Sequence, residues 1–74
     1  MAYQTIPIKP SSNLLSIQFD PETKDLLGTF IRNGRQYVAH GVDAKTAEGF
    51  SQAPSPGRYW NAFIRDSSFF VEEI

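Results

Sequence analysis

The strongest local signals in this chain lie in the segment Ser55-Pro56-Gly57-Arg58-Tyr59-Trp60-Asn61-Ala62-Phe63-Ile64-Arg65-Asp66. Ser55 is a favourable N-cap, and Pro56 suits the first helical position, where a missing backbone N–H is not needed. Apolar residues then recur four positions apart, which is the spacing of one helix face. These positions are Tyr59, Trp60, Phe63 and Ile64. The segment therefore predicts a helix that starts at Ser55 and anchors the hydrophobic core.

The same segment carries a polar stripe made of Arg58, Asn61 and Arg65, at positions i, i+3 and i+7. This spacing places all three side chains on one side of a regular helix. Two guanidiniums with an amide between them suit the recognition of phosphates or carboxylates. The alternative is a solvated helix face on which Arg65 pairs with Asp66 or a neighbouring carboxylate.

Upstream of this helix the sequence predicts strands. Leu15, Ile17 and Phe19 alternate with polar residues, which indicates a half-buried strand. The range 26–31 is the next strand, and 36–40 is the third. The Asn33-Gly34 dipeptide between them favours a two-residue hairpin turn in which both residues have positive φ. Residues 4–10 form a short extended segment that Pro7 restricts to a sheet edge.

The predicted strand at 26–31 has apolar side chains on both of its faces. Leu27 and Ile31 share one face, and Leu26 and Phe30 share the other. An antiparallel sheet face that is open to water is expected to be polar. Either the chain's own helices or terminus cover the second face, or Phe30 belongs to an interaction surface.

Helical and strand signals follow the third strand. Asp43 is a good N-cap for a first helix, with Gly49 in its middle to allow close packing onto the sheet. Residues 69–72 predict a last strand. We therefore predict one α+β domain over residues 1–74: an antiparallel meander of three to four strands, two short helices on one face, and a C-terminal strand.

A second group of candidate binding residues surrounds the hairpin. Arg32 and Arg35 flank the Asn33-Gly34 turn, and Tyr37 follows on the strand. Aromatic side chains beside arginines can stack bases while the guanidiniums contact phosphates. The alternative is that the arginines only keep the turn soluble and that Tyr37 is a core residue. Arg35 and Tyr37 join Arg58, Asn61 and Arg65 as the candidate ligand-binding set.

Composition limits the classes of function. The 74 residues carry a net charge of −1 and a pI near 5.6, so binding to nucleic acid cannot depend on overall positive charge. The sequence contains no membrane-length apolar run and no signal-peptide pattern at its start. It has no cysteine, which suits a reducing compartment. We expect a cytoplasmic protein without a membrane partner.

Catalytic and metal-binding patterns are not found in the sequence. His40 is the single histidine and has no second ligand of matching type near it, so it is interpreted as a structural or surface residue. HExxH, CxxC, GxGxxG and P-loop motifs do not occur. We predict a protein that is not an enzyme, with no catalytic residue, cofactor or metal.

Several of these segments together resemble the KTSC domain, a small domain found at the C-terminus of some lysyl-tRNA synthetases and as stand-alone bacterial or phage proteins. The resemblance runs from about Ile6 to Val71. It rests on the segments 11–13, 20–23, 33–34 with Tyr37, and 53–66. Its most specific part is the run Ser-x-Gly-x-Tyr-aromatic-Asn-x-x-Ile-Arg, which begins at Ser55. The resemblance implies the predicted fold, and attachment to a synthetase implies RNA binding as a candidate function.

The sequence also departs from the family's pattern. The family often has Tyr-x-Tyr followed by an aromatic residue in the central strand, whereas here Tyr37 is followed by Ala39 and His40. The leading hypothesis is a non-catalytic module that binds RNA or single-stranded nucleic acid through its arginine-bearing helix face. The alternative is a protein-interaction or self-associating module that uses Phe30 and the pair Phe69-Phe70.

Overall fold

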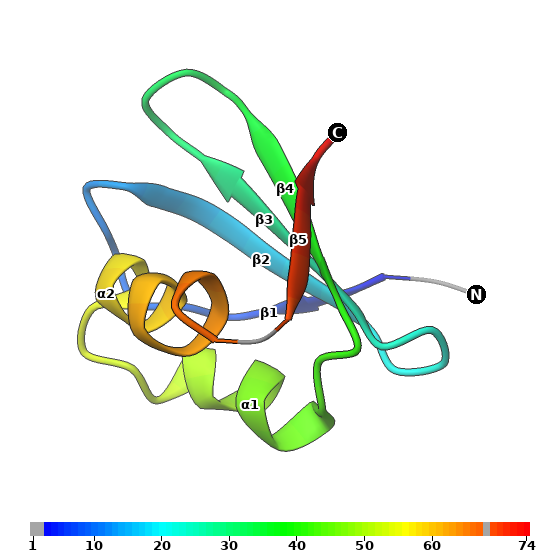
Figure 1. Cartoon of the computed structure of the whole chain (residues 1–74). Helices are drawn as coiled ribbons and strands as arrows, with labels where there is room; N and C mark the ends of the chain where they lie inside the picture. Colours follow the sequence, from blue (N-terminus) through cyan, green and yellow to red (C-terminus); the bar gives the residue numbers. More distant parts are fainter. Residues whose placement is uncertain (1–2, 68) are drawn as a thin grey trace.

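The computed structural model describes residues 3–67 and 69–74 of the chain. Five strands form one antiparallel sheet in chain order: β1 (Gln4–Ile6), β2 (Leu14–Asp20), β3 (Asp25–Phe30), β4 (Gln36–His40) and β5 (Phe70–Glu73). The helices α1 (Ala44–Glu48) and α2 (Pro56–Trp60) lie between β4 and β5 in sequence and cover one face of the sheet (Figure 1). The α+β prediction is confirmed, and β1 is an edge strand that ends just before Pro7.

The core lies between the helices and the sheet. Phe50, Trp60 and Ile64 from the helical segments are almost completely buried, as are Ile17 and Leu26 from the sheet. The buried cluster consists of Leu14, Ile17, Phe19, Leu26, Ala39, Val42, Ala47, Phe50, Trp60 and Ile64. Trp60 and Ile64 therefore anchor the core, as the sequence predicted.

The prediction that Leu15 belongs to the buried face of β2 is wrong. Leu15 is 61% exposed, whereas Leu14 is buried. The cause is a β-bulge, because the pairing of β2 with β3 shifts register between Leu14 and Ser16. A bulge adds one residue to a strand and so moves the side chains before it to the other face.

The hairpin between β3 and β4 also differs from the expected two-residue turn. Among the described residues that are not glycine, only Lys24 has a positive φ, so Asn33 does not adopt the predicted conformation. Gly34 has φ +67, and its N–H donates to the Phe30 carbonyl. The Asn33 side chain instead accepts a hydrogen bond from the Arg35 N–H. The loop is therefore longer than predicted, and it extends away from the helices (Figure 1).

The two apolar faces of β3 have different environments. Leu26 joins the core under the helices, and Phe30 is half-buried at the end of the strand. Leu27 lies on the face without helices, where it pairs with Gln18 and Val38. The helices therefore cover one face, while Leu27 and Val38 on the other face are also buried, at 8% and 5% exposure.

The first helix begins as predicted but ends earlier. The Asp43 carboxylate accepts the Thr46 N–H at 3.1 Å, which is an N-cap hydrogen bond. The α-helix ends at Glu48, and residues 49–51 form a 3₁₀ turn. A Cβ at Gly49 would overlap the Tyr59 hydroxyl, so this glycine allows close contact with α2 rather than with the sheet.

The second helix changes its geometry after one turn. Ser55 and Pro56 occupy the N-cap and N1 positions as predicted, although the Ser55 side chain makes no capping hydrogen bond. Asn61–Arg65 continue as a π-helical turn, marked by the bond from the Asp66 N–H to the Asn61 carbonyl. Phe63 is 53% exposed and rests on the Tyr59 ring, so the predicted apolar face is narrower than four residues.

Candidate ligand pocket

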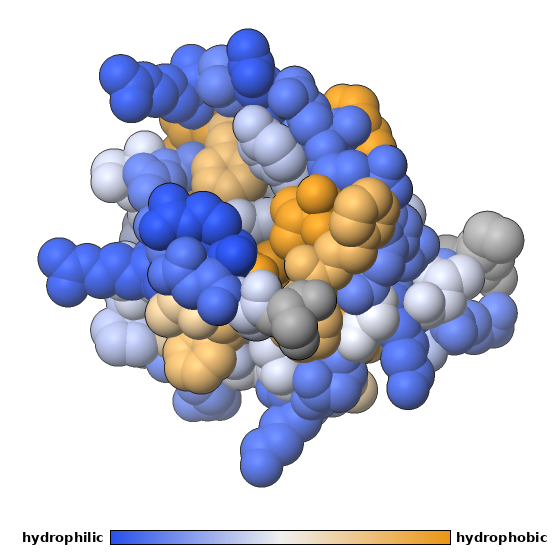
Figure 2. All heavy atoms as spheres, viewed as in Figure 1, coloured by the Kyte–Doolittle hydropathy of each residue, from blue (hydrophilic) through white to orange (hydrophobic). Residues whose placement is uncertain are grey.

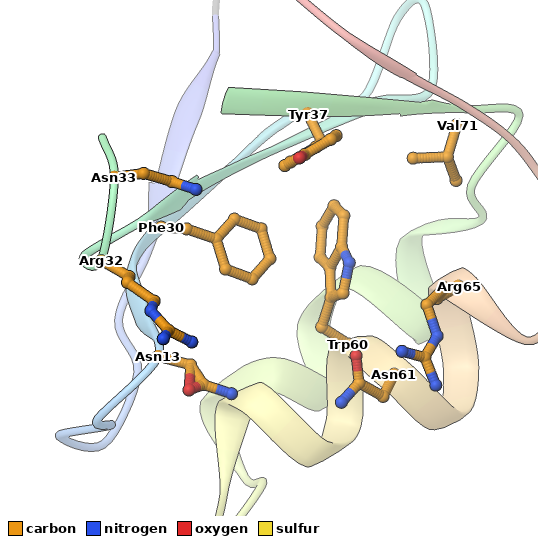
Figure 3. A pocket seen from close by; sticks show the side chains of 9 residues that line it. All are labelled: Asn13, Phe30, Arg32, Asn33, Tyr37, Trp60, Asn61, Arg65 and Val71. Carbon is orange, nitrogen blue, oxygen red and sulfur yellow. The ribbon is translucent and has the colours of Figure 1, made fainter. Parts of the chain in front are cut away.

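A pocket of about 430 Å³ opens where β3, β4 and β5 meet the second helix. It is lined by Asn13, Phe30, Arg32, Asn33, Tyr37, Trp60, Asn61, Arg65 and Val71 (Figure 3). In the same orientation as Figure 1, hydrophilic side chains gather over the π turn and hydrophobic ones over β5 (Figure 2). The lining residues thus come from both layers of the fold and from two loops.

Three aromatic side chains form the apolar wall of the pocket. The Phe30 ring meets Tyr37 and Trp60 edge-on, with centroid separations of 5.6 and 5.5 Å. Gly28 makes this arrangement feasible, because a Cβ there would lie 2.7 Å from Cζ3 of Trp60. The indole ring can therefore lie directly against the backbone of β3. The three rings are held by the sheet and by one helix, so the wall is preorganised.

Trp60 carries a polar group that has no protein partner. Its side chain is only 4% exposed. Its indole N–H has no hydrogen-bond acceptor within residues 3–67 and 69–74. The nitrogen nevertheless keeps some contact with solvent. Buried polar groups are normally hydrogen-bonded. An indole N–H that reaches solvent only at a pocket wall is a donor available to a ligand.

Arginines stand on the rim of the pocket, and no acidic residue lines it. Arg32 has no ion pair or hydrogen-bond partner in the part of the chain that the structure describes. Arg65 pairs through Nε with the exposed Asp66 carboxylate at 3.2 Å, and its two terminal nitrogens have no acceptor among the described residues. The pocket is therefore locally positive although the whole chain has a charge of −1.

Two asparagines place side-chain amides at the same rim. Asn13 is positioned by Ser11, whose Oγ accepts the Asn13 N–H at 3.2 Å, and by the bond from the Ile31 N–H to the Asn13 carbonyl. A Cβ at Gly57 would lie 2.8 Å from the Asn13 amide nitrogen, so this glycine lets the loop approach the helix. The amides of Asn13 and Asn61 make no hydrogen bond with the described residues.

The structure brings together three of the five predicted site residues. Tyr37, Asn61 and Arg65 line the pocket. Arg58 is exposed on α2 outside the pocket, because the π turn prevents the regular helical stripe that the sequence predicted. Arg35 is also outside and pairs with Glu73 at 3.5 Å.

The sequence did not identify the remaining lining residues as one site. Arg32 was recognised beside the hairpin and Phe30 as an interaction candidate, whereas Trp60 was assigned only to the core. Asn13, Asn33 and Val71 carried no functional signal. Of the three positions at which the family often has aromatic residues in this strand, only Tyr37 lines the pocket. Ala39 is fully buried under the helices, and His40 lies on the opposite face of the sheet. The aromatic wall is therefore shared between the sheet and the helix rather than gathered on one strand.

His40 belongs to a separate cluster on the helix-free face. Its Nδ1 lies 2.8 Å from an Asp25 carboxylate oxygen and its Nε2 lies 2.7 Å from one of Glu72. The Phe70 ring stacks on it at 5.6 Å. The hydrogen bond to Glu72, followed by that to Asp25, raises the pKa of His40 above 6.5. This agrees with the predicted structural role.

Neither a metal site nor a membrane-spanning helix emerges from the described part of the chain. No three histidine, cysteine, aspartate or glutamate side chains there are grouped so as to hold a metal ion. No helix within residues 3–67 and 69–74 is long and apolar enough to cross a bilayer.

Comparisons with known proteins identify a family. The model of the KTSC domain matches residues 10–69. Among solved structures, the crystal structure of a KTSC domain protein from Yersinia pestis is similar to this chain, with a TM-score of 0.83 and 32% sequence identity. The similarity covers 99% of each chain. A search of curated proteins finds no match.

Proposed function

This chain belongs to the KTSC domain family, and we propose that it is a non-catalytic module that binds single-stranded nucleic acid in the aromatic pocket. One observation carries the proposal. Aromatic rings and unpartnered hydrogen-bond donors line a single pocket that contains no carboxylate. Such a lining complements a ligand that is flat, rich in acceptors and negatively charged.

A nucleotide combines these three properties. Its base presents a π-face to aromatic side chains, and stacking on such rings contributes about 1–3 kcal/mol per base. Its ring nitrogens and carbonyls can accept from the Trp60 N–H, and the asparagine amides can serve as donor or acceptor. Its phosphates match the guanidiniums of Arg32 and Arg65. A duplex keeps its bases stacked inside, so the wall favours an unstacked, single-stranded base.

The same lining supports binding rather than catalysis. It contains no histidine, carboxylate, cysteine or lysine, which are the usual groups for proton transfer near neutral pH. We therefore propose that a bound strand is held and released unchanged.

The test uses Trp60, the only tryptophan in the sequence, as an internal reporter. A base that stacks on the half-exposed rings of Phe30 and Tyr37 lies beside this indole and should change its fluorescence as RNA or DNA is titrated. The probe is an unstructured strand of about 12 nucleotides, within the site sizes of single-strand-binding folds. Quenching by single strands with little quenching by a hairpin duplex supports the proposal. Unchanged fluorescence and unchanged anisotropy of a labelled strand would refute it.

Two charge-removing variants and one matched control sharpen this test. Arg32→Gln and Arg65→Gln should each weaken binding about tenfold, since one charge-assisted hydrogen bond is worth roughly 1.5–3 kcal/mol and these sites are partly screened. Arg58→Gln removes an exposed arginine from the same helix outside the pocket and should change the affinity little. Equal losses in all three variants would indicate non-specific attraction instead.

A protein partner is the second candidate, and exposed apolar residues on an edge strand favour it. Phe70 and Ile74 are each 66% exposed at β5, whose outer edge has no strand partner in the described sheet. Phe30, by contrast, faces the pocket and is half-buried. Sedimentation velocity should reveal a concentration-dependent dimer that Phe70→Ser abolishes. A monomer at all concentrations would remove self-association as a function.

A further inference from the structure

The two pocket arginines lie on opposite sides of the aromatic wall. Arg32 comes from the β3–β4 loop beside Phe30, and Arg65 comes from the π turn on the far side of Trp60 (Figure 3). Their side chains approach the opening from different elements, so they do not form one clamp on a single group. The rim therefore has two separated positions for negative charge.

The volume of the pocket limits how much of a strand it can hold. At about 430 Å³ it lies near the lower end of the roughly 300–1,000 Å³ typical of small-ligand sites. The lining offers one continuous aromatic wall, with Phe30 perpendicular to both Tyr37 and Trp60. There is room for one base and its sugar, without a second stacking platform.

The chain as a whole carries no excess of positive charge. Seven lysines and arginines are balanced by eight acidic residues in the whole sequence. The neighbouring Arg35 is paired with Glu73 at the edge of β5. A groove that follows many phosphates needs clustered, unpaired cations, and those at this site are Arg32 and Arg65.

We propose, on the basis of the function proposed above, that the pocket holds one nucleotide from within a strand. Its base lies against Trp60 and the neighbouring rings, and its two flanking phosphates contact Arg32 on one side and Arg65 on the other. Within a strand each nucleoside has a phosphate on its 5′ and on its 3′ side. Two separated guanidiniums beside one base pocket match that arrangement.

The proposal makes a quantitative statement about salt. Single strands lose affinity with a log–log slope of about −0.7 for each phosphate that is neutralised. Two contacts therefore give a slope of about −1.4 between roughly 50 and 200 mM salt. Each of Arg32→Gln and Arg65→Gln should reduce the slope to about −0.7, whereas Arg58→Gln should leave it unchanged.

Titrations with three small ligands test directly whether both arginines contact phosphates of the same nucleotide. A nucleoside 3′,5′-bisphosphate, the matching 5′-monophosphate and the free nucleoside are titrated against the intact chain, with Trp60 fluorescence as the readout. We expect the bisphosphate to bind about tenfold more tightly than the monophosphate, since it gains one charge-assisted contact. One of the two variants Arg32→Gln and Arg65→Gln should abolish this advantage, namely the one that lacks the partner of the 3′-phosphate. The other should weaken both ligands and keep the advantage, and Arg58→Gln should leave both affinities unchanged.

The outcomes separate this inference from the function on which it rests. If single strands bind but the bisphosphate has no advantage, or if the salt slope is steeper than about −3, the one-nucleotide site is wrong and strand binding stands. If neither strands nor nucleotides bind, both proposals are overturned. Near-ultraviolet circular dichroism of each variant shows that a loss of binding is not a loss of fold.

Discussion

Gly28 is the residue that lets a tryptophan form the floor of the pocket. Its lack of a side chain allows the Trp60 indole to lie against the backbone of β3, with the nearest ring carbon 2.7 Å from where a Cβ would be. Trp60 is also a core residue at 4% exposure, so the ring cannot move outward without losing its packing. One backbone position thus supports both the stability of the fold and the shape of the site.

Gly28→Ala should therefore destabilise the protein and impair ligand binding together. The added methyl group forces the indole to shift, and overpacking of this kind typically costs about 1–3 kcal/mol. Chemical denaturation measures the change in the free energy of unfolding, and fluorescence titration measures binding. Stability equal to that of the wild-type chain would show that the ring relaxes freely and does not depend on this glycine.

His40 gives the protein a specific dependence of stability on pH. Its pKa is raised above 6.5 by Glu72 first and by Asp25 second, so the folded state binds the proton more tightly than the unfolded state. The contribution is complete below pH 6.5 and is lost as pH rises through the raised folded pKa. Stability should therefore fall across this window, and His40→Gln should flatten the fall.

Nuclear magnetic resonance titration checks the origin of this effect, because the sequence has one histidine. The His40 ring signal should titrate above 6.5 in the wild-type chain and move toward that value in Glu72→Gln. A midpoint at or below 6.5 in the folded wild type would contradict the ion-pair geometry. The cluster lies on the helix-free face, so nucleotide binding should not follow the same curve.

At the level of elements, the β3–β4 loop positions part of the pocket rim, and one glycine in this loop has a left-handed backbone conformation. Gly34 has φ +67 with no atom near its missing Cβ, and Gly41 has φ +78 in equally open surroundings. Alanine at either position should cost about 1–2 kcal/mol from backbone strain alone. Since Gly34 adjoins Arg32 and Asn33, Gly34→Ala should also weaken nucleotide binding, whereas Gly41→Ala should not. Equal affinities in the two variants would show that the loop does not contribute.

Regular elements were predictable from the sequence because their signals are local. Asp43 caps the first helix and Pro56 starts the second, as their chemistry requires. Irregular features were not predictable. The bulge at Leu15 depends on the register with β3, and the π turn adds an i→i+5 bond that no residue pattern announces.

The candidate site was predictable only in part for the same reason. Arg65, Asn61 and Tyr37 stood out by residue type, and the structure places them together. The role of Trp60 depends on Gly28, which is distant in the sequence and becomes its neighbour only after folding. The exclusion of Arg58 follows from the π turn and could not be derived from regular helical spacing.

At the scale of the whole molecule, a small core makes each buried aromatic residue decisive. A chain of 74 residues has an expected stability of about 4–11 kcal/mol, from roughly 0.05–0.15 kcal/mol per residue. Phe50 is fully buried and packs against Tyr59 at 4.5 Å. Phe50→Ala should cost about 3–5 kcal/mol, which is a large part of that stability.

Phe63→Ala is the matched control, because Phe63 also contacts the Tyr59 ring at 4.5 Å but is 53% exposed. Its loss should lower the melting temperature only slightly, since little buried area is removed. Thermal denaturation followed by circular dichroism compares the two variants. Similar losses in both would mean that the contact with Tyr59, rather than burial, determines the stability.

The pocket draws its walls from residues between 13 and 71, on three strands, two loops and the second helix. Val71 contributes only when β5 has paired with β4, the last pairing in the strand order. Binding is then thermodynamically linked to global unfolding, so that ligand at about 100 times its Kd should add about 2.7 kcal/mol to stability. Fragments that omit β5 or the second helix should show no residual affinity, because each of these elements contributes residues to the lining.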